Sequence, residues 1–155
     1  MFKKILKYND LIVRETIIGL MIIMITFVFV QVLLRYITKN PLTWTDEASR
    51  FCLLWLVFLG CAVGVEKEQH LRVDSLPKLL KKRYRGILDS IVSIFSILFF
   101  IVILWEGVKI TFAVADQRSP AMNISMGIFY GSLPVGAILM IWYSFLNLIE
   151  KVRPN

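Results

Sequence analysis

The chain has 155 residues, of which 57% are hydrophobic and only 19% are charged. A soluble domain has about 25% charged residues and is about 45–50% apolar even when glycine is counted, so a soluble fold of this size could not bury so much apolar surface. The same composition excludes a disordered chain, the two cysteines exclude a disulfide framework, and the single histidine argues against a histidine-rich metal or haem site.

Four apolar stretches follow one another along the chain, and a helix of about 20 apolar residues crosses about 30 Å of hydrocarbon. We expect spans at about residues 16–35, 47–66, 87–106 and 128–149. The runs do not alternate between apolar and polar positions, which argues against a transmembrane β-barrel. The helical pattern of the third span continues to about residue 116, so this helix should tilt or project from the bilayer. The sequence therefore predicts an all-α integral membrane protein, with four long transmembrane helices in one membrane domain over residues 1–155.

The positions of the 18 lysine and arginine residues predict the orientation. If both termini are inside, 13 of these residues lie on the inner side and 5 on the outer side. Cytoplasmic loops of membrane proteins carry such an excess of basic residues, so we expect both termini in the cytoplasm. This bias also accounts for the net charge of +7 without a nucleic-acid partner.

The connection between the second and third spans is rich in basic residues. Its leucines at 76, 79 and 80 share one helical face, which predicts a short amphipathic helix on the cytoplasmic surface. A plain basic loop is the alternative. The basic residues expected to contact phospholipid headgroups are Lys78, Lys81, Lys82, Arg83 and Arg85.

The densest polar cluster lies just outside the second span and contains Trp44, Asp46, Glu47 and Arg50. Tryptophan is typical of a membrane interface, and acidic residues in a first turn favour the helix dipole. Arg50 lies three residues after Glu47 and four after Asp46, so either carboxylate can pair with it. We expect the adjoining apolar run to desolvate Arg50 partly. The cluster fits a helix cap, and it also fits a contact with a partner.

Small residues recur at four-residue spacing in the second and fourth spans, and such faces allow helices to approach closely. The pairs are Gly60 and Gly64, Gly127 and Gly131, and Ser132 and Gly136. Pro134 has no backbone N–H, which frees the carbonyl of Tyr130 and predicts a kink in the fourth helix.

The sequence lacks a recognisable catalytic or metal-binding pattern. Cys52 and Cys61 are nine residues apart on one helix and lie on opposite sides of it, so they cannot pair. His70 and its acidic neighbours match no closed ligand spacing. We therefore expect no enzyme activity, no metal and no cofactor.

Two groups of residues resemble the small (DctQ-like) membrane subunit of tripartite ATP-independent periplasmic (TRAP) transporters. The first group is Trp44, Asp46-Glu47, Arg50, Trp55, Phe58-Leu59-Gly60, and His70 to Asp74, and the second is Ser119-Pro120, Tyr130 and Pro134-Val135-Gly136. The resemblance covers about residues 10–150. The family carries two glutamates where this chain has Asp46-Glu47.

The resemblance implies a subunit of the bacterial inner membrane that acts as a scaffold for a large TRAP permease subunit on a separate chain. It also implies import of an organic acid, such as a C4-dicarboxylate or sialic acid, delivered by a periplasmic substrate-binding protein. Sodium coupling is expected in the large subunit. The residues expected at subunit interfaces are Trp44, Asp46, Glu47, Arg50, Trp55, Gly60, Gly64, His70, Asp74, Ser119, Pro120 and Pro134.

Two other classes of protein were compared with this interpretation. A stand-alone homo-oligomeric four-helix exporter or channel would need an acidic residue deep in a span, and the sequence has none there. A membrane enzyme subunit that holds haem or quinone conflicts with the single histidine.

Overall fold

The computed structural model describes residues 2–38, 42–67 and 82–152, and it describes side chains over residues 10–37, 42–67 and 91–149. These residues form α-helices joined by short connections. The helices are α1 (Phe2–Thr38), α2 (Thr43–Lys67), α3 (Lys82–Ala113), α4 (Met126–Tyr130) and α5 (Ser132–Val152).

Four helical segments are long and apolar enough to cross a membrane, which confirms the all-helical, four-span prediction. They are Asp10–Ile37, Thr43–Lys67, Ile91–Ala113 and Met126–Ile149. Both α1, with 37 residues, and α3, with 32, are about 50 Å long, which exceeds the thickness of the hydrocarbon core. These helices must therefore tilt or project beyond it.

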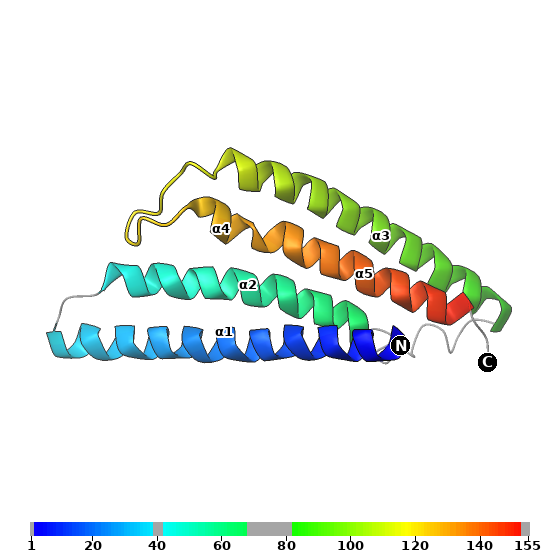
Figure 1. Ribbon diagram of the computed structural model, residues 1–155, viewed down its shortest axis with the longest axis horizontal. Coiled ribbons are helices and arrows are strands. Elements are labelled where there is room, and N and C mark those ends of the chain that lie inside the picture. The colour runs from blue at the N-terminus through cyan, green and yellow to red at the C-terminus, as the bar shows by residue number, and fades with distance from the viewer. Residues whose placement is uncertain (1, 39–41, 68–81, 153–155) are drawn as a thin grey trace.

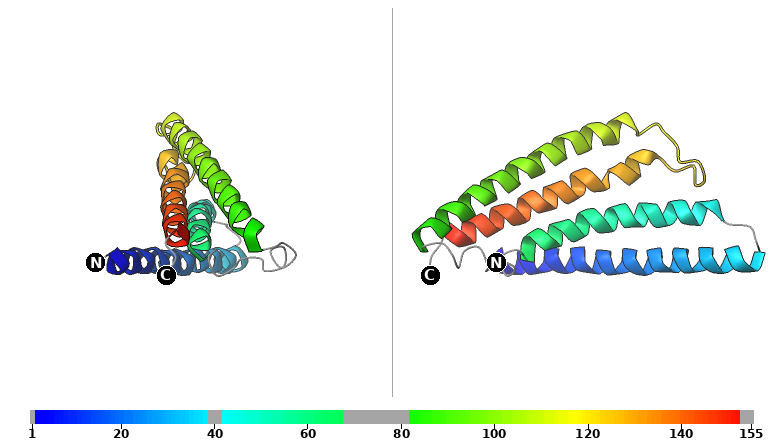
Figure 2. Two further views of the ribbon diagram at one scale, coloured as in Figure 1. Left: turned by 90° about the vertical axis from the view of Figure 1, so that its right-hand side faces the viewer. Right: turned by 180° about the vertical axis from the view of Figure 1, so that it is seen from behind.

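The helices are arranged as an open row and do not form a closed bundle. α1 packs along α2, α2 packs along α5, and α5 packs along α3, with α4 between α3 and α5 at one end. Figures 1 and 2 show this order and the way α1 crosses the other helices at an angle. As a result, α1 and α3 each have a neighbour on one side only.

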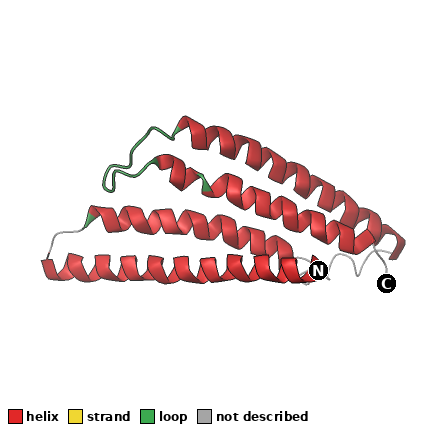
Figure 3. Cartoon of the chain, viewed as in Figure 1, coloured by secondary structure: helices red, strands yellow, loops and turns green. Residues whose placement is uncertain are grey.

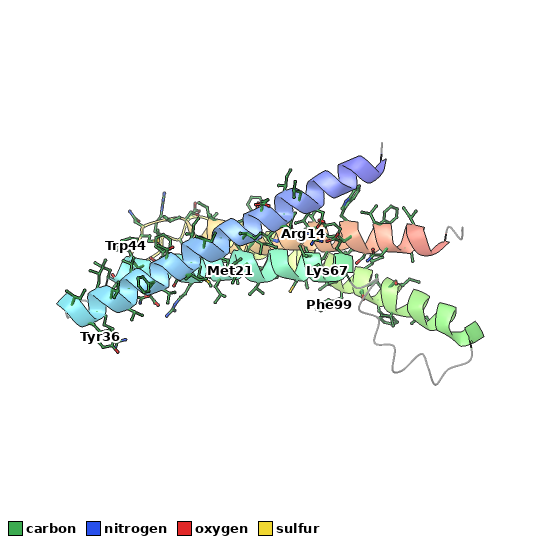
Figure 4. The ribbon with its side chains drawn as sticks, turned by 90° about the horizontal axis from the view of Figure 1, so that it is seen from below. Arg14, Met21, Tyr36, Trp44, Lys67 and Phe99 are labelled. Atoms are coloured by element: carbon green, nitrogen blue, oxygen red, sulfur yellow. The ribbon has the colours of Figure 1, made fainter. Side chains whose placement is uncertain are left out.

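Only a small core is buried in this row. Its centre is Ala62 of α2 with Met140 and Tyr143 of α5. The edge helices instead expose large apolar side chains, such as Phe29 at 63%, Phe95 at 68% and Phe112 at 77%. In Figure 4, Phe99 of α3 and Tyr36 of α1 lie at the outside of the row. A surface of this kind is stable only against lipid or another membrane protein.

The fourth span is interrupted between α4 and α5, as the position of Pro134 predicts. Gly131 separates the two helices, and its N–H still donates to the carbonyl of Gly127 at 2.8 Å. Figure 3 shows the short non-helical link. Because Pro134 has no N–H, the carbonyl four residues before it cannot make the usual helical hydrogen bond.

The two ends of the row differ in what they contain. The loop end holds the start of α2 and the connection between α3 and α4, whereas the terminal end holds the start of α1 and the end of α5 (Figure 1). The start and the end of the described chain therefore both lie at the terminal end of the row, as an even number of spans requires. The expected amphipathic helix falls mostly on residues 68–81, outside the described residues, and Lys82 is the first residue of α3.

Candidate functional site

The carboxylate of Glu47 connects α2 to the turn between α3 and α4. Its Oε2 atom accepts hydrogen bonds from the backbone N–H groups of Ala121, at 3.0 Å, and Met122, at 2.7 Å. Charged acceptors make stronger hydrogen bonds than neutral ones, so this contact fixes the turn onto the first turns of α2. Glu47, from the first group of residues that carried the family resemblance, is therefore adjacent to the turn at Ser119-Pro120 from the second group.

The turn itself is ordered by its own backbone. Ser119, 3% exposed, donates its N–H to the carbonyl of Ile124 at 2.8 Å, and its carbonyl accepts from Asn123 at 3.0 Å. Asn123 has a positive φ of 54°, a conformation that asparagine tolerates better than most residues. Pro120 and Ala121 are exposed at the tip.

Arg50 pairs with Asp46 and not with Glu47. Its Nη2 atom lies 2.9 Å from Oδ2 of Asp46, and the Arg50 side chain is 72% exposed. The expectation that the apolar run desolvates Arg50 is therefore wrong for this chain. Glu47 is occupied by the turn, which leaves Asp46 as the partner of Arg50.

Aromatic side chains complete the contacts near the loop end. Trp44 lies edge-on to Phe27 of α1, with ring centroids 6.0 Å apart. Trp55 donates its indole N–H to the carbonyl of Ile128 in α4 at 3.2 Å. The two predicted tryptophans thus connect α2 to its neighbours on both sides.

The glycines divide into packed and open positions. A Cβ atom on Gly136 would lie 2.7 Å from Cβ of Phe58, so α5 and α2 touch there. Gly107 of α3, which the sequence analysis missed, is similarly close to Leu133 and to Pro134. By contrast, a Cβ atom on Gly60 or Gly64 would meet nothing within 4 Å. The predicted Gly60–Gly64 face is therefore open in this chain.

The terminal end has an ion-pair cluster that the sequence analysis also missed. Arg14 of α1 contacts Asp10 at 2.7 Å and Glu66 of α2 at 3.1 Å. Nearby, the side-chain amide of Asn147 in α5 donates to the carbonyl of Val65 at 2.9 Å. The spacing of Asp10 and Arg14 signals a helical pair, but nothing in the sequence pairs either with residue 66.

The side chains of the remaining predicted residues are outside the part of the chain that the structure describes. His70, Asp74, Lys78 and Lys81 lie outside the described residues. Lys82, Arg83 and Arg85 belong to the first turn of α3, where the side chains are not described. Within the described ranges, no group of three or more histidine, cysteine, aspartate or glutamate side chains is placed to hold a metal ion.

Comparison with known proteins gives consistent matches. Residues 24–154 match the family described as "Tripartite ATP-independent periplasmic transporters, DctQ component". A Haemophilus influenzae protein with the provisional name TRAP transporter small permease protein is 26% identical over 154 residues, which is 99% of this chain and 93% of that protein. The sialic acid TRAP transporter small permease protein SiaQ of Vibrio cholerae is 23% identical over 157 residues, which is 99% of this chain and 87% of SiaQ.

A longer relative is matched over only part of its length. The sialic acid TRAP transporter permease protein SiaT of Haemophilus influenzae is 28% identical over 113 residues, which is 72% of this chain but 18% of SiaT. Most of that permease therefore lies outside the match.

Proposed function

The chain belongs to the family of DctQ components of TRAP transporters, and we propose that it is a scaffold for a large permease subunit during sodium-driven import of an organic acid. As a member of this family it is a small permease subunit and a multi-pass membrane protein. Its relatives are transporter subunits and not enzymes. The bacterial inner membrane, with both termini in the cytoplasm, is the location that we propose.

The open row of helices is the observation that carries this proposal. A self-sufficient transporter would need a path lined by its own helices, whereas this chain buries only a small core and exposes the apolar faces of α1 and α3. The part of SiaT outside the match supports a partner much larger than this chain. In this proposal, the partner corresponds to that part of SiaT and is a separate polypeptide.

We place the contact with the large subunit on the open face of α2. Leu53 and Val57, each about half exposed, continue the line of Gly60 and Gly64 along this helix. Because no residue of the described chain covers the two glycines, a partner helix can approach the backbone closely there. Bulky residues on the other exposed faces suit lipid better.

The loop end is our proposed contact for a periplasmic substrate-binding protein. The exposed turn at Pro120 and Ala121 is held rigidly by Glu47, and Asp46 and Arg50 lie exposed nearby. A rigid projection with exposed charges suits docking of a soluble protein. His70 and Asp74, which the family resemblance also implies, would act on the opposite side of the membrane.

Sodium coupling and substrate binding are assigned to the other subunits. Among the described residues, the acidic side chains of the four candidate spans lie within about two turns of a span end, at Asp10, Glu15, Asp46, Glu47, Glu66 and Glu106. A carboxylate near mid-membrane is what a sodium or proton site would use. We therefore propose that this chain needs no cofactor or ion of its own.

Uptake measurements test the proposal. The chain, a large TRAP permease subunit and a binding protein loaded with sialic acid or a C4-dicarboxylate are reconstituted in liposomes, with each membrane subunit also tested alone. We expect uptake that follows an inward sodium gradient only when both membrane subunits are present. Uptake by this chain alone would contradict the scaffold proposal and favour a homo-oligomeric transporter.

A further inference from the structure

The ion-pair cluster at the terminal end holds two carboxylates on one guanidinium. Arg14 Nε lies 2.7 Å from Oδ1 of Asp10, and Arg14 Nη2 lies 3.1 Å from Oε2 of Glu66. The Asp10 and Glu66 side chains are only 22% and 27% exposed. In Figure 4, Arg14 lies on α1 where this helix crosses the last turns of α2, near Lys67. Two helices thus share one partly buried polar contact.

A third helix places an unpartnered polar group beside this contact. Tyr143 of α5 is 3% exposed, and its hydroxyl has no hydrogen-bond partner among the described residues. The ring packs against Ala62, which lies one turn before Glu66 on α2. Asn147, one turn after Tyr143, contacts Val65, the residue next to Glu66. These contacts place Tyr143 beside the end of α2 that carries Glu66, and its hydroxyl lies within electrostatic range of Glu66, Asp10 and Arg14.

A buried hydroxyl without a partner is unfavourable, and buried groups of this kind are normally bonded to protein or to an ordered water. We propose that one water molecule binds between the Tyr143 hydroxyl and the Glu66 carboxylate. The water accepts a hydrogen bond from the Tyr143 hydroxyl and donates a hydrogen bond to the Glu66 carboxylate. This bridge joins α1, α2 and α5 in one polar network.

The charges at the site favour water over a metal cation. The carboxylates of Asp10 and Glu66 are matched by Arg14 and by Lys67, which lies within electrostatic range of Asp10. No excess negative charge is left among these four groups to attract a cation. A water molecule needs only two to four polar partners, and the hydroxyl, the carboxylate and the neighbouring Asn147 side chain supply them.

The network has a consequence for the fold, independent of the proposed transport role. α1 packs along α2 and not along α5, so packing alone gives α1 no strong coupling to α5. With the bridge in place, a substitution of Arg14 on α1 changes the contribution of Tyr143 on α5 to stability. The angle at which α1 crosses the row is then fixed by three helices at the terminal end.

A double-mutant cycle tests this coupling on the full chain in nanodiscs. Tyr143→Phe, Arg14→Gln and the double variant are compared by their Tm. We expect the double variant to lose about 2–4 °C less than the sum of the two single losses, because the second substitution removes a network already broken. Tyr36→Phe, which removes the hydroxyl of a residue of α1 that is 81% exposed, is the matched control and should be additive with Arg14→Gln. Additive losses for Tyr143→Phe would overturn the network.

Two further readings separate water from other occupants. Infrared difference spectra between the parent and Tyr143→Phe isolate the C–O–H bands of Tyr143. If these bands show a hydrogen-bonded hydroxyl in the parent and a free hydroxyl in Glu66→Ala, they support the bridge. The Tm should be equal in sodium, potassium and choline chloride. A Tm that rises only in sodium chloride would overturn the proposal and indicate that a sodium ion binds in place of the water. A high-resolution density map with Tyr143 bonded directly to Glu66, or with an empty site, would also overturn the proposal.

Discussion

The two sides of α2 contrast sharply although both are rich in small residues. On the packed side, the small residues Thr45, Ala48, Ser49 and Ala62 are buried together with Leu59. On the open side, Gly60, Cys61 and Gly64 are exposed. Across the α2–α5 contact, Gly136 lets Phe58 approach to within a distance that no Cβ atom would permit. A small residue therefore marks a close helix contact, but its partner can lie inside the chain or outside it.

This contrast assigns different roles to motifs that look alike in the sequence. Gly136 is needed for the chain to fold, because α2 and α5 are the central pair of the row. Gly60 and Gly64 are not needed for folding, since the space beside them is open. Substitutions on the two sides should therefore affect different measurements.

The largest effect on stability is expected for Gly136→Leu. The new side chain would collide with both the Cβ atom and the carbonyl oxygen of Phe58, so α5 would have to move away from α2. Overpacking of this kind costs about 1–3 kcal/mol, and backbone contacts place this case at the upper end or beyond. Thermal unfolding in nanodiscs measures the loss, with Gly64→Leu as the control that should not lower the Tm. A parent-like Tm for Gly136→Leu would contradict the close contact.

The next largest effect is expected for Glu47→Ala. Two backbone N–H groups, of Ala121 and Met122, would lose their charged acceptor, which costs about 1–3 kcal/mol when the groups are buried and less where water replaces the carboxylate. Hydrogen exchange at these two amides should become faster, whereas Asp46→Ala should leave it unchanged. Equal exchange rates in Glu47→Ala and the parent would contradict the hydrogen bonds from these two amides to Glu47.

A smaller effect of opposite sign is expected for Gly60→Ala and Gly64→Ala. Alanine is favoured over glycine in a helix interior by about 0.5–1 kcal/mol, and a Cβ atom meets nothing at either position. The chain alone should therefore gain up to a few degrees in Tm. A loss at either position would indicate that the space is filled within this chain.

The smallest effect is expected for Arg50→Ala. An exposed pair four residues apart on a helix contributes about 0.3–0.5 kcal/mol, and Arg50 is 72% exposed. The Tm of the chain should hardly change. If the substitution nevertheless reduces uptake by the complete transporter, Arg50 contacts another subunit, and parent-like uptake would leave it as a helix-stabilising residue only.

The sequence alone was sufficient to predict the helical spans but not their packing. Long apolar runs identify four membrane-crossing helices, and Pro134 predicts the break near Gly131, because both signals are local. The order of the helices in the row depends on contacts between residues far apart in the chain. Glu47 and Met122 are 75 positions apart, and Arg14 and Glu66 are 52 apart, so no local pattern reveals either pair.

The sequence leaves the partner of Arg50 open for a physical reason of the same kind. Asp46 and Glu47 are both suitably spaced on the helix, and only the distant turn decides between them by occupying Glu47. Likewise, the spacing of Gly60 and Gly64 indicates a contact face but does not identify the helix that covers it.

Co-purification with a large permease subunit tests the central proposal most directly. The tagged chain carrying both Gly60→Leu and Gly64→Leu is compared with the parent and with Gly19→Leu, at a glycine of α1 where an added Cβ atom would also meet nothing within 4 Å. We expect the double variant to have a Tm no lower than the parent but to recover about tenfold less large subunit, which corresponds to about 1.4 kcal/mol of lost binding free energy, while Gly19→Leu recovers a parent-like amount. Equal recovery by all three proteins would contradict assembly through the open face of α2.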